Sequence, residues 1–277
     1  MAYNFFSLFG SELKSVTQSA AILALAGIFA DVLSLFRDRL LASEFGASRA
    51  LDIYYASFRI PDFLYTFSLF FAASTALIPI LLEKVSTDKK GSEEFFGNIF
   101  SLFSLATIFL VIVAYFAIPS LTPYFMPGFA PEEQAEAINL SRILLLSPLF
   151  LGLSNLLSSI IQSFKRFYVY AASPLFYNLG IIIGIVFLMP KMGIAGIVWG
   201  VILGASLHFA IQLPTIFSLG FSLRPRFPKI SSDVLRSLKL SLPRTLGLSL
   251  NQLVLSAITA MASTLGAGAV SVFNFAS

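Results

Sequence analysis

Long apolar runs recur along the whole chain, and they constrain the fold more than any other feature of the sequence. Each run is long enough to cross the core of a bilayer as a helix, which takes about 20 residues. The 277 residues are 57% hydrophobic and 12% charged, whereas soluble domains carry about 25% charged residues. We therefore expect an all-α fold, a polytopic transmembrane helical bundle.

The apolar pattern divides into seven complete spans and the start of an eighth. The expected spans cover residues 16–41, 51–82, 95–117, 137–164, 169–189, 194–216 and 234–265, and the eighth begins near Gly266. The first run is too long for a signal peptide, so we expect it to be retained as a span. The chain stops inside an apolar run, and we expect it to be the N-terminal part of a longer protein.

The charges between the spans predict how the chain threads through a membrane. Lysines and arginines follow the second, fourth and sixth spans, while the loop after the third has none and holds Glu132, Glu133 and Glu136. Because basic loops stay in the cytoplasm, this pattern predicts a multi-pass protein with a cytoplasmic N-terminus. It also accounts for the net charge of +4, so we expect no nucleic-acid partner.

A basic connector after the sixth span is the best candidate for a domain boundary. Its apolar residues Ile230, Val234, Leu235 and Leu238 alternate with bases, which is typical of a short amphipathic helix lying in the membrane interface. A basic cytoplasmic loop that runs directly into the seventh span is an equally open interpretation. Either way, we expect residues 1–221 to form one unit and residues 222–277 to begin another.

Several kinds of chemistry are missing from the sequence. There is no cysteine and a single histidine, His208, which excludes disulfides, thiolate zinc sites and histidine metal clusters within this chain. No GxxxxGK[ST], GxSxG or HExxH motif is present, and those motifs mark phosphate loops, serine hydrolases and zinc proteases. We expect no cofactor, no metal site and no enzymatic activity.

Charged side chains inside the first span point to a polar cavity. At the helical period, Asp31, Arg37 and Asp38 share an arc with small residues, while bulky apolar residues fill the other arc. Charges at membrane depth are costly, so they usually face water or each other. Arg37 and Asp38 lie near the end of the span and could instead mark the membrane interface, but Asp31 lies deeper.

The second span repeats this pattern. A polar face advances by helical steps along it, formed by Asp52, Tyr55, Arg59, Asp62, Thr66 and Ala73. Arg59 and Asp62 are spaced to pair, and Pro61 between them is expected to kink the helix as a hinge. Kinked helices with inward charges line substrate paths in transporters. The competing interpretation is a structural ion pair that locks two helices together.

Later spans carry signals for helix packing. Gly196, Gly200 and Gly204 form two successive GxxxG steps, which favour close helix contact. His208 and Gln212 lie one turn apart and are expected to join helices, with a proton relay as the alternative. Asn178 and Gln252 are expected to form hydrogen bonds between helices.

Four segments in sequence order resemble one known family. They are FRDRLLASEFGA…LDIYYASFRIPDFL…ALIPIL, then FKRFYVYAASPLFYNLGIIIG, then GIAGIVWGVILGASLHFAIQLP, then LPRTLGLSLNQLVLSAITAMASTLGAGAVSVFNFA. Together they resemble the MurJ (MviN) family, the lipid II flippases of the multidrug/oligosaccharidyl-lipid/polysaccharide exporter superfamily. The resemblance covers the chain from about Ser19 onward.

The resemblance implies two bundles of about six helices around a central cavity that opens alternately on each side. Residues 1–221 would then be the N-terminal six-helix lobe, and residues 222–277 the basic connector and the first helices of the C-terminal lobe. Arg37 would grip the pyrophosphate of a lipid carrier, with Arg59 as a second base. Asp38 and Asp52 would shape or gate the cavity, and Ser271 matches a small polar position on the eighth helix.

The chain departs from the family pattern at several of these positions. The family has an arginine where this chain has Asp31, another at Tyr65, and an asparagine at Asp62. It has a Glu-Gly pair at Phe70 and Phe71, and an Asp-Arg pair that begins at Ser277. The cavity is therefore expected to be less positive than is usual for the family.

The resemblance implies a flippase in the cytoplasmic (inner) membrane of a bacterium. Its partners would be a lipid-linked glycan substrate and membrane lipids, with a coupling ion as a further candidate, and its substrate would be the peptidoglycan precursor lipid II. The alternative is a polysaccharide-unit flippase or a cation-coupled drug antiporter of the same superfamily. A third hypothesis is a membrane scaffold that transports nothing, in which the polar faces serve only helix association.

Overall fold

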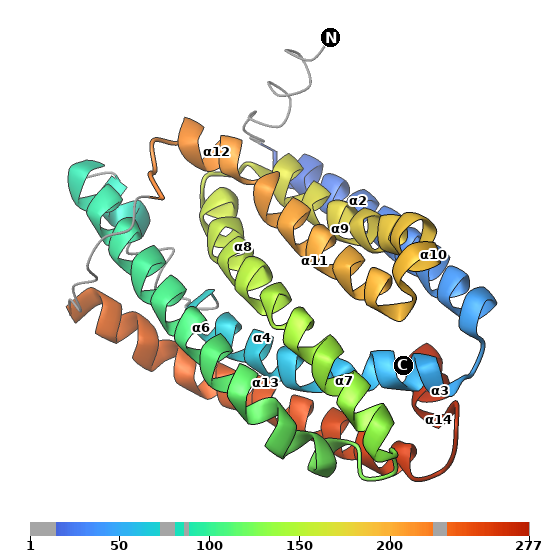
Figure 1. Ribbon diagram of the computed structural model, residues 1–277. Helices are drawn as coiled ribbons and strands as arrows, with labels where there is room; N and C mark the ends of the chain where they lie inside the picture. The colour runs from blue at the N-terminus through green and yellow to red at the C-terminus, as the bar shows by residue number, and fades with distance from the viewer. Residues whose placement is uncertain (1–14, 73–80, 86–88, 224–231, 277) are drawn as a thin grey trace.

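The computed structural model describes residues 15–72, 81–85, 89–223 and 232–276. Within these ranges all regular elements are helical, as expected for an all-α bundle. Figure 1 shows them as long rods packed side by side, with α2, α9 and α11 along one edge and α6 and α13 along the opposite edge. The elements are α2 (Val16–Phe45), α3 (Arg49–Ser57), α4 (Arg59–Ala72), α6 (Lys89–Phe125), α7 (Pro131–Leu144), α8 (Leu146–Ser163), α9 (Phe167–Ile183), η1 (Gly184–Leu188), α10 (Met189–Met192), α11 (Ile194–Ala210), α12 (Leu213–Ser218), α13 (Ser232–Ser263) and α14 (Ala269–Ala276).

Five helical segments in the described ranges are long and apolar enough to cross a membrane. They are Val16–Phe45, Lys90–Phe125, Pro131–Ser163, Phe167–Met192 and Ile194–Ser218, and they match the expected first, third, fourth, fifth and sixth spans. The structure extends the third span by several residues at each end. It also divides the fourth, fifth and sixth spans into shorter helices joined almost in line.

The expected second span is broken between α3 and α4. The break falls at Phe58, and Pro61 lies one turn later inside α4. Proline has no N–H, so the Ser57 carbonyl four residues earlier loses its helical donor. The Ser141 hydroxyl on α7 replaces that donor and bonds this carbonyl at 2.9 Å. The predicted kink therefore lies three residues before Pro61, where a neighbouring helix stabilises it.

Glycines bring α9 and α11 into backbone contact. A Cβ added at Gly180 would lie 2.2 Å from the Gly204 Cα, and one added at Gly184 would lie 2.5 Å from the Gly200 Cα. No side chain fits at that separation, so the two helices can approach only because these positions are glycine. The GxxxG prediction for the sixth span is confirmed, with Gly180 and Gly184 as its partners.

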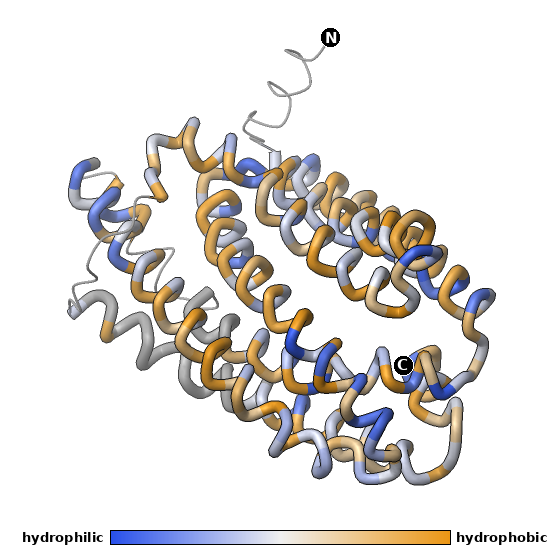
Figure 2. The backbone as a smooth tube through the Cα atoms, in the orientation of Figure 1, coloured by the Kyte–Doolittle hydropathy of each residue, from blue (hydrophilic) through white to orange (hydrophobic). Residues whose placement is uncertain are grey.

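The outer face of α2 is apolar and uncovered within this chain. Leu25, Phe29 and Leu35 are more than half exposed, and they lie on the arc that the sequence predicted to face lipid. Figure 2 shows hydrophobic residues distributed along the length of most helices. This distribution is typical of helices surrounded by lipid, because the solvent around them is itself apolar.

The connector was predicted to form an amphipathic helix or a loop. Residues 224–231, which include Ile230, lie outside the described residues, and α13 begins at Ser232. The side chains of Val234 and Leu238 also lie outside the described residues. The division at residues 221 and 222 therefore stays a prediction.

Candidate functional site

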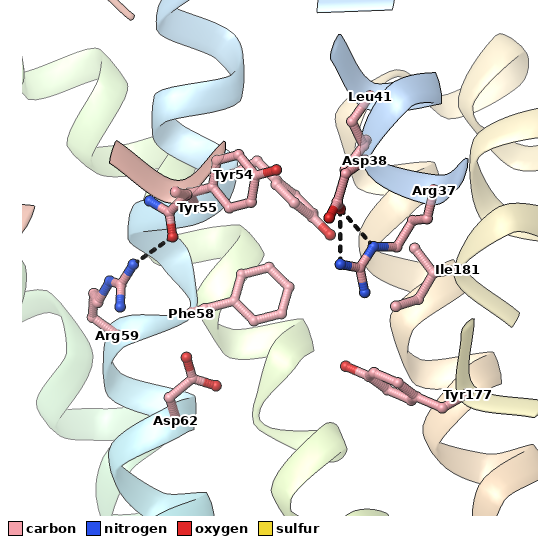
Figure 3. A pocket seen from close by; sticks show the side chains of 11 residues that line it. Arg37, Asp38, Leu41, Tyr54, Tyr55, Phe58, Arg59, Asp62, Tyr177 and Ile181 are labelled. Carbon is pink, nitrogen blue, oxygen red and sulfur yellow. Dashed lines mark hydrogen bonds and ion pairs between the residues drawn. The ribbon is translucent and has the colours of Figure 1, made fainter. Parts of the chain in front are cut away.

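A polar pocket lies where α2, α3, α4, α9 and α14 meet, and we call it the central pocket. Its volume is about 190 Å³. Figure 3 shows Arg37 and Asp38 on one side and Arg59 and Asp62 on the other, with tyrosine and phenylalanine rings between them. The pocket is lined by Arg37, Asp38, Leu41, Tyr54, Tyr55, Phe58, Arg59, Asp62, Tyr177, Ile181 and Asn274.

Arg37 is held in place by three neighbours. Its Nε donates to the Asp38 carboxylate at 2.8 Å, its Nη1 to the Asn178 Oδ1 at 3.1 Å, and its Nη2 to the Ser34 hydroxyl at 3.0 Å. The side chains of Arg37 and Asp38 remain 22% and 34% exposed, so the ion pair is open to the pocket. These bonds fix the guanidinium plane on the pocket wall, and Asn178 makes the predicted interhelical bond.

Arg59 is buried more deeply and is less well satisfied. Its side chain is 5% exposed, and its Nη2 donates to the Asn274 Oδ1 on α14 at 2.8 Å. Its Nε is buried and has no hydrogen-bond partner among the described residues. A buried guanidinium with an unused donor is costly unless another acceptor completes it.

Asp62 does not form the expected pair with Arg59. In the described part of the chain, the ion pairs within 4.0 Å are Arg37–Asp38 and Arg49–Glu133. Figure 3 shows the Asp62 carboxylate facing the pocket and the Tyr177 ring, while Arg59 turns away toward Asn274. The Arg59 guanidinium bonds the Asn274 side chain on α14 instead of Asp62. Because α14 is remote from α4 in sequence, the spacing within α4 could not indicate this contact.

A second cavity adjoins the central pocket, and we call it the inner pocket. It has a volume of about 260 Å³ and is enclosed by α4, α7, α8, α9 and α11. Phe58, Asp62 and Tyr177 line both cavities, so they form the boundary between them. The rest of its lining is Pro61, Tyr65, Leu144, Ser147, Pro148, Leu151, Pro174 and His208.

His208 and Gln212 belong to a polar network that joins α8, α9 and α11. The Ser154 hydroxyl lies 2.5 Å from the His208 Nδ1, and the Gln212 amide nitrogen donates to Ser154 at 2.6 Å and to Ser173 at 3.2 Å. The prediction that this pair joins helices is confirmed. Since Nδ1 is engaged, the other ring nitrogen of His208 is the one left for the inner pocket.

Asp52 lines neither pocket, and its expected part in shaping or gating the cavity stays a prediction. Its side chain is fully buried and accepts hydrogen bonds from the Gly268 N–H at 2.6 Å, the Ser271 N–H at 2.7 Å and the Ser271 hydroxyl at 2.6 Å. It therefore caps the N-terminus of α14, where free N–H groups and the helix dipole attract a carboxylate. Ser271, also predicted in the cavity, is its partner.

Backbone contacts pack the same end of the molecule, which we call the closed end. A Cβ added at Gly268 would lie 2.5 Å from the Ala47 carbonyl oxygen, and one added at Gly128 would lie 2.1 Å from the Ser263 carbonyl oxygen. Gly268 also has a φ of +89°, which favours glycine. The turns after α2, α6 and α13 thus meet at one end, as the predicted threading requires.

Asp31 is the remaining predicted residue, and it lines neither pocket. It lies on the same helix as Arg37, nearly two turns earlier, and its side chain is exposed. Sequence reasoning missed Asn274, Tyr54 and Tyr177 as pocket residues. Asn274 and Tyr177 carried no charge signal, and their positions depend on how distant helices pack.

A bundle of long apolar helices around a polar pocket defines the fold of a polytopic membrane protein. Solved structures agree with this class. The fold matches a structure described as "Lipid II flippase MurJ, inward closed conformation" with a TM-score of 0.75 and 27% identity, covering 92% of this chain and 53% of that chain. It also matches an inward-facing multidrug resistance MATE family transporter of the MOP superfamily, with a TM-score of 0.61 and 17% identity over 87% of this chain and 56% of that one. This second likeness shows the fold alone.

Sequence comparisons are more specific. The model of the family "Lipid II flippase MurJ" matches residues 41–277. The "Probable lipid II flippase MurJ" of Buchnera aphidicola is 33% identical, over 91% of this chain and 50% of the relative. The "Lipid II flippase MurJ" of Burkholderia cenocepacia is 31% identical, over 92% of this chain and 52% of the relative. The chain belongs to the lipid II flippase MurJ family, and it spans about half the length of these relatives.

Proposed function

We propose that the full-length protein moves the peptidoglycan precursor lipid II, or a closely similar lipid-linked oligosaccharide, from the inner to the outer leaflet of a bacterial cytoplasmic membrane. The observation that carries this proposal is the placement of two guanidinium groups, Arg37 and Arg59, on opposite sides of one pocket. Guanidinium is planar and offers paired donors to phosphate oxygens, which makes arginine suited to a diphosphate. The names of the relatives give the substrate class.

The two arginines would bind the headgroup in different ways, one as a fixed group and the other as a movable one. Arg37 is fixed by Asp38, Asn178 and Ser34, so it forms a rigid side of the site. Arg59 has a buried Nε without a partner in the described residues, and its Nη2 bonds Asn274 on α14, so it would exchange this bond for one to the ligand. The lipid tail would remain in the bilayer while the headgroup occupies the pocket.

Transport by this site would require the closed end to open and the opposite end to close. The Asp52 carboxylate holds α14 against α3, and α14 would belong to the second lobe that begins after residue 221. Breaking these bonds would separate the lobes on this side. The break between α3 and α4, with Pro61 next to it, would act as the hinge that lets the second span bend.

We place the N-terminus and the basic loops in the cytoplasm, so the closed end faces outward. Transport needs an energy source, and the sequence has no nucleotide-binding motif. An ion gradient or the membrane potential would supply it. No group of three or more His, Cys, Asp or Glu side chains that could hold a metal ion occurs in the described ranges.

The test reverses the charge of one arginine on α2 in the full-length protein. Arg37→Glu should abolish rescue of cells depleted of their lipid II flippase, because a carboxylate in this place repels the diphosphate. Arg39→Glu is the matched control, because Arg39 is two residues away and exposed, and it should rescue normally. Both proteins should reach the membrane in equal amounts. If Arg37→Glu still supports growth, the assignment of Arg37 to the headgroup is wrong.

A second candidate is a cation-coupled drug antiporter or a polysaccharide-unit flippase, and the acids in the central pocket favour the antiporter. Asp38 and Asp62 balance the two arginines, which leaves less positive charge than a dianion would prefer. Single cysteines at Ser34, Tyr55 and Asp62 can be introduced because the chain has none of its own. Labelling by water-soluble thiol reagents supports either transporter, and complete protection would support the scaffold hypothesis.

A further inference from the structure

The inner pocket holds acidic and basic groups that the binding of a diphosphate does not use. Asp62 on α4 and His208 on α11 both line it. Tyr65, Tyr177 and Ser147 contribute hydroxyl groups, and the Tyr65 hydroxyl also accepts a hydrogen bond from the Asn155 amide at 2.9 Å. The volume of about 260 Å³ has space for several water molecules.

Asp62 differs from the other acids beside the central pocket. Within the described residues, no side chain donates a hydrogen bond to its carboxylate and no cation lies within 4.0 Å of it. Arg59 is occupied by Asn274, and Arg37 by Asp38. A half-buried carboxylate left without a donor is unfavourable in its charged form. Binding a proton neutralises this carboxylate and removes the cost of its unsolvated charge.

The charges around Asp62 indicate that a proton would bind it when an anionic ligand enters the central pocket. Around the central pocket are two cations, Arg37 and Arg59, and two acids, Asp38 and Asp62, so their formal charges cancel while both acids are ionised. The other titratable groups are Tyr54 and Tyr55 on α3, Tyr65 on α4, Tyr177 on α9 and His208 on α11. A diphosphate entering a neutral pocket meets repulsion from both carboxylates, and Asp38 is already held by Arg37.

We propose that the inner pocket is a proton-binding site at which Asp62 takes up one proton when an anionic headgroup binds in the central pocket, with His208 as its second proton-holding group. The proposal rests on the proposed function. Protonation removes one negative charge and gives the pocket a net positive charge for the ligand. By linkage, the ligand then favours the proton as strongly as the proton favours the ligand.

A metal ion fits this pocket less well than a proton. Alkali and alkaline-earth ions prefer several oxygen ligands, whereas the described lining offers one carboxylate, a few hydroxyl groups and an imidazole. His208 is also fixed by the Ser154 contact at its Nδ1, which orients its free ring nitrogen. Water in the pocket can carry a proton between such a nitrogen and the Asp62 carboxylate.

Calorimetry on the detergent-solubilised full-length protein tests the proposal. The probe is a short-chain prenyl diphospho-sugar, a diester whose own charge stays constant near neutral pH. Titrations in two buffers of different ionisation enthalpy give the number of protons taken up per ligand bound. The wild-type protein should take up as much as one proton, and its affinity should fall by about tenfold per pH unit where Asp62 is ionised.

Asp62→Asn should bind the probe with no proton uptake and with little dependence on pH. Glu44→Gln, which removes an exposed carboxylate from α2, is the control and should keep the wild-type uptake. Asp62→Ser provides a second neutral variant, and thermal unfolding checks that each protein is folded. Replacing sodium with a large organic cation should change nothing.

The outcomes separate the two proposals. If the probe binds without proton uptake, if Asp62→Asn keeps the uptake, or if binding depends on sodium at constant pH, the proton site is wrong and diphosphate binding stands. If the probe binds at no pH, diphosphate recognition itself is contradicted. The proton-site proposal is then also contradicted, because it depends on that binding.

Discussion

Asp52 and Asp62 lie ten residues apart on the second span, yet their surroundings are opposite. Asp52 is fully buried and accepts three hydrogen bonds from Gly268 and Ser271. Asp62 is half-buried beside two cavities, and in the described ranges its carboxylate accepts none. One aspartate thus joins α3 to α14 at the closed end, while the other lies beside the pockets with no hydrogen-bond donor to its carboxylate in the described residues.

The comparison separates an acid whose hydrogen bonds are complete from one whose hydrogen bonds, within the described residues, are not. A carboxylate whose oxygens are completed by N–H and O–H donors is fixed in one charge state and one position. A carboxylate without donors responds to whatever enters beside it, whether a proton, a cation or a moving guanidinium. We therefore expect the Asp52 carboxylate to keep its charge and position while its hydrogen bonds hold. We expect the charge state of Asp62 to depend on what binds beside it.

The largest expected effect comes from removing the acid at the closed end. Asp52→Ala leaves the N–H groups of Gly268 and Ser271 without their acceptor, while the Ser271 hydroxyl keeps its bond to the Ser48 carbonyl at 3.4 Å; each lost bond to a charged group is worth about 1.5–3 kcal/mol. With two such bonds lost, we expect the contact between α3 and α14 to weaken by on the order of 3–6 kcal/mol. A single cysteine at the buried Val270 should then react rapidly with water-soluble thiol reagents.

Asp31→Ala is the control for this labelling, because Asp31 is exposed on α2 and makes no contact at the closed end. It should leave the cysteine at position 270 protected. Continued protection in Asp52→Ala would show that packing alone keeps this end closed and that the Asp52 bonds are dispensable.

A smaller effect is expected where the closed end depends on close backbone contact. Gly128→Ala places a methyl group 2.1 Å from the Ser263 carbonyl oxygen, so the turn before α7 has to move away from α13. We expect a loss of about 1–3 kcal/mol of stability, measured as a lower midpoint of thermal unfolding in detergent. Gly247→Ala is the matched control, because nothing lies within 4 Å of its added methyl group, and an unchanged midpoint in Gly128→Ala would contradict the contact.

The sequence predicted the bundle well because apolar length and helical period are local properties. The described spans, the small-residue contact of Gly200 and Gly204, and the polar faces of the first two spans all follow from spacing along one helix. The kink near Pro61 was displaced because the position of a break depends on the neighbour that satisfies the freed carbonyl, here Ser141.

The site was harder to predict because it depends on contacts between remote helices. Helical spacing put Asp52 and Asp62 on one face, but it could not show that Asp52 would cap α14 or that Arg59 would bond Asn274 on α14 instead of Asp62. Arg37 and Asp38 line the central pocket and pair with each other; this contact joins sequence neighbours, so it does not depend on how remote helices pack. The role of Asp62 in binding remains a prediction.

The smallest expected effect separates the two acids directly, by stability rather than by function. Asp62→Asn should change the unfolding midpoint very little, corresponding to less than about 0.5 kcal/mol, because its carboxylate has no donor to lose within the described residues. Asp52→Asn should lower the midpoint clearly, since an amide nitrogen cannot accept the bonds from Gly268 and Ser271. Both changes keep the shape of the side chain, so a difference between them reports hydrogen-bond satisfaction rather than packing. Equal losses in the two variants would mean that Asp62 has a structural partner of its own, and the contrast between a closed end and a responsive pocket would be wrong.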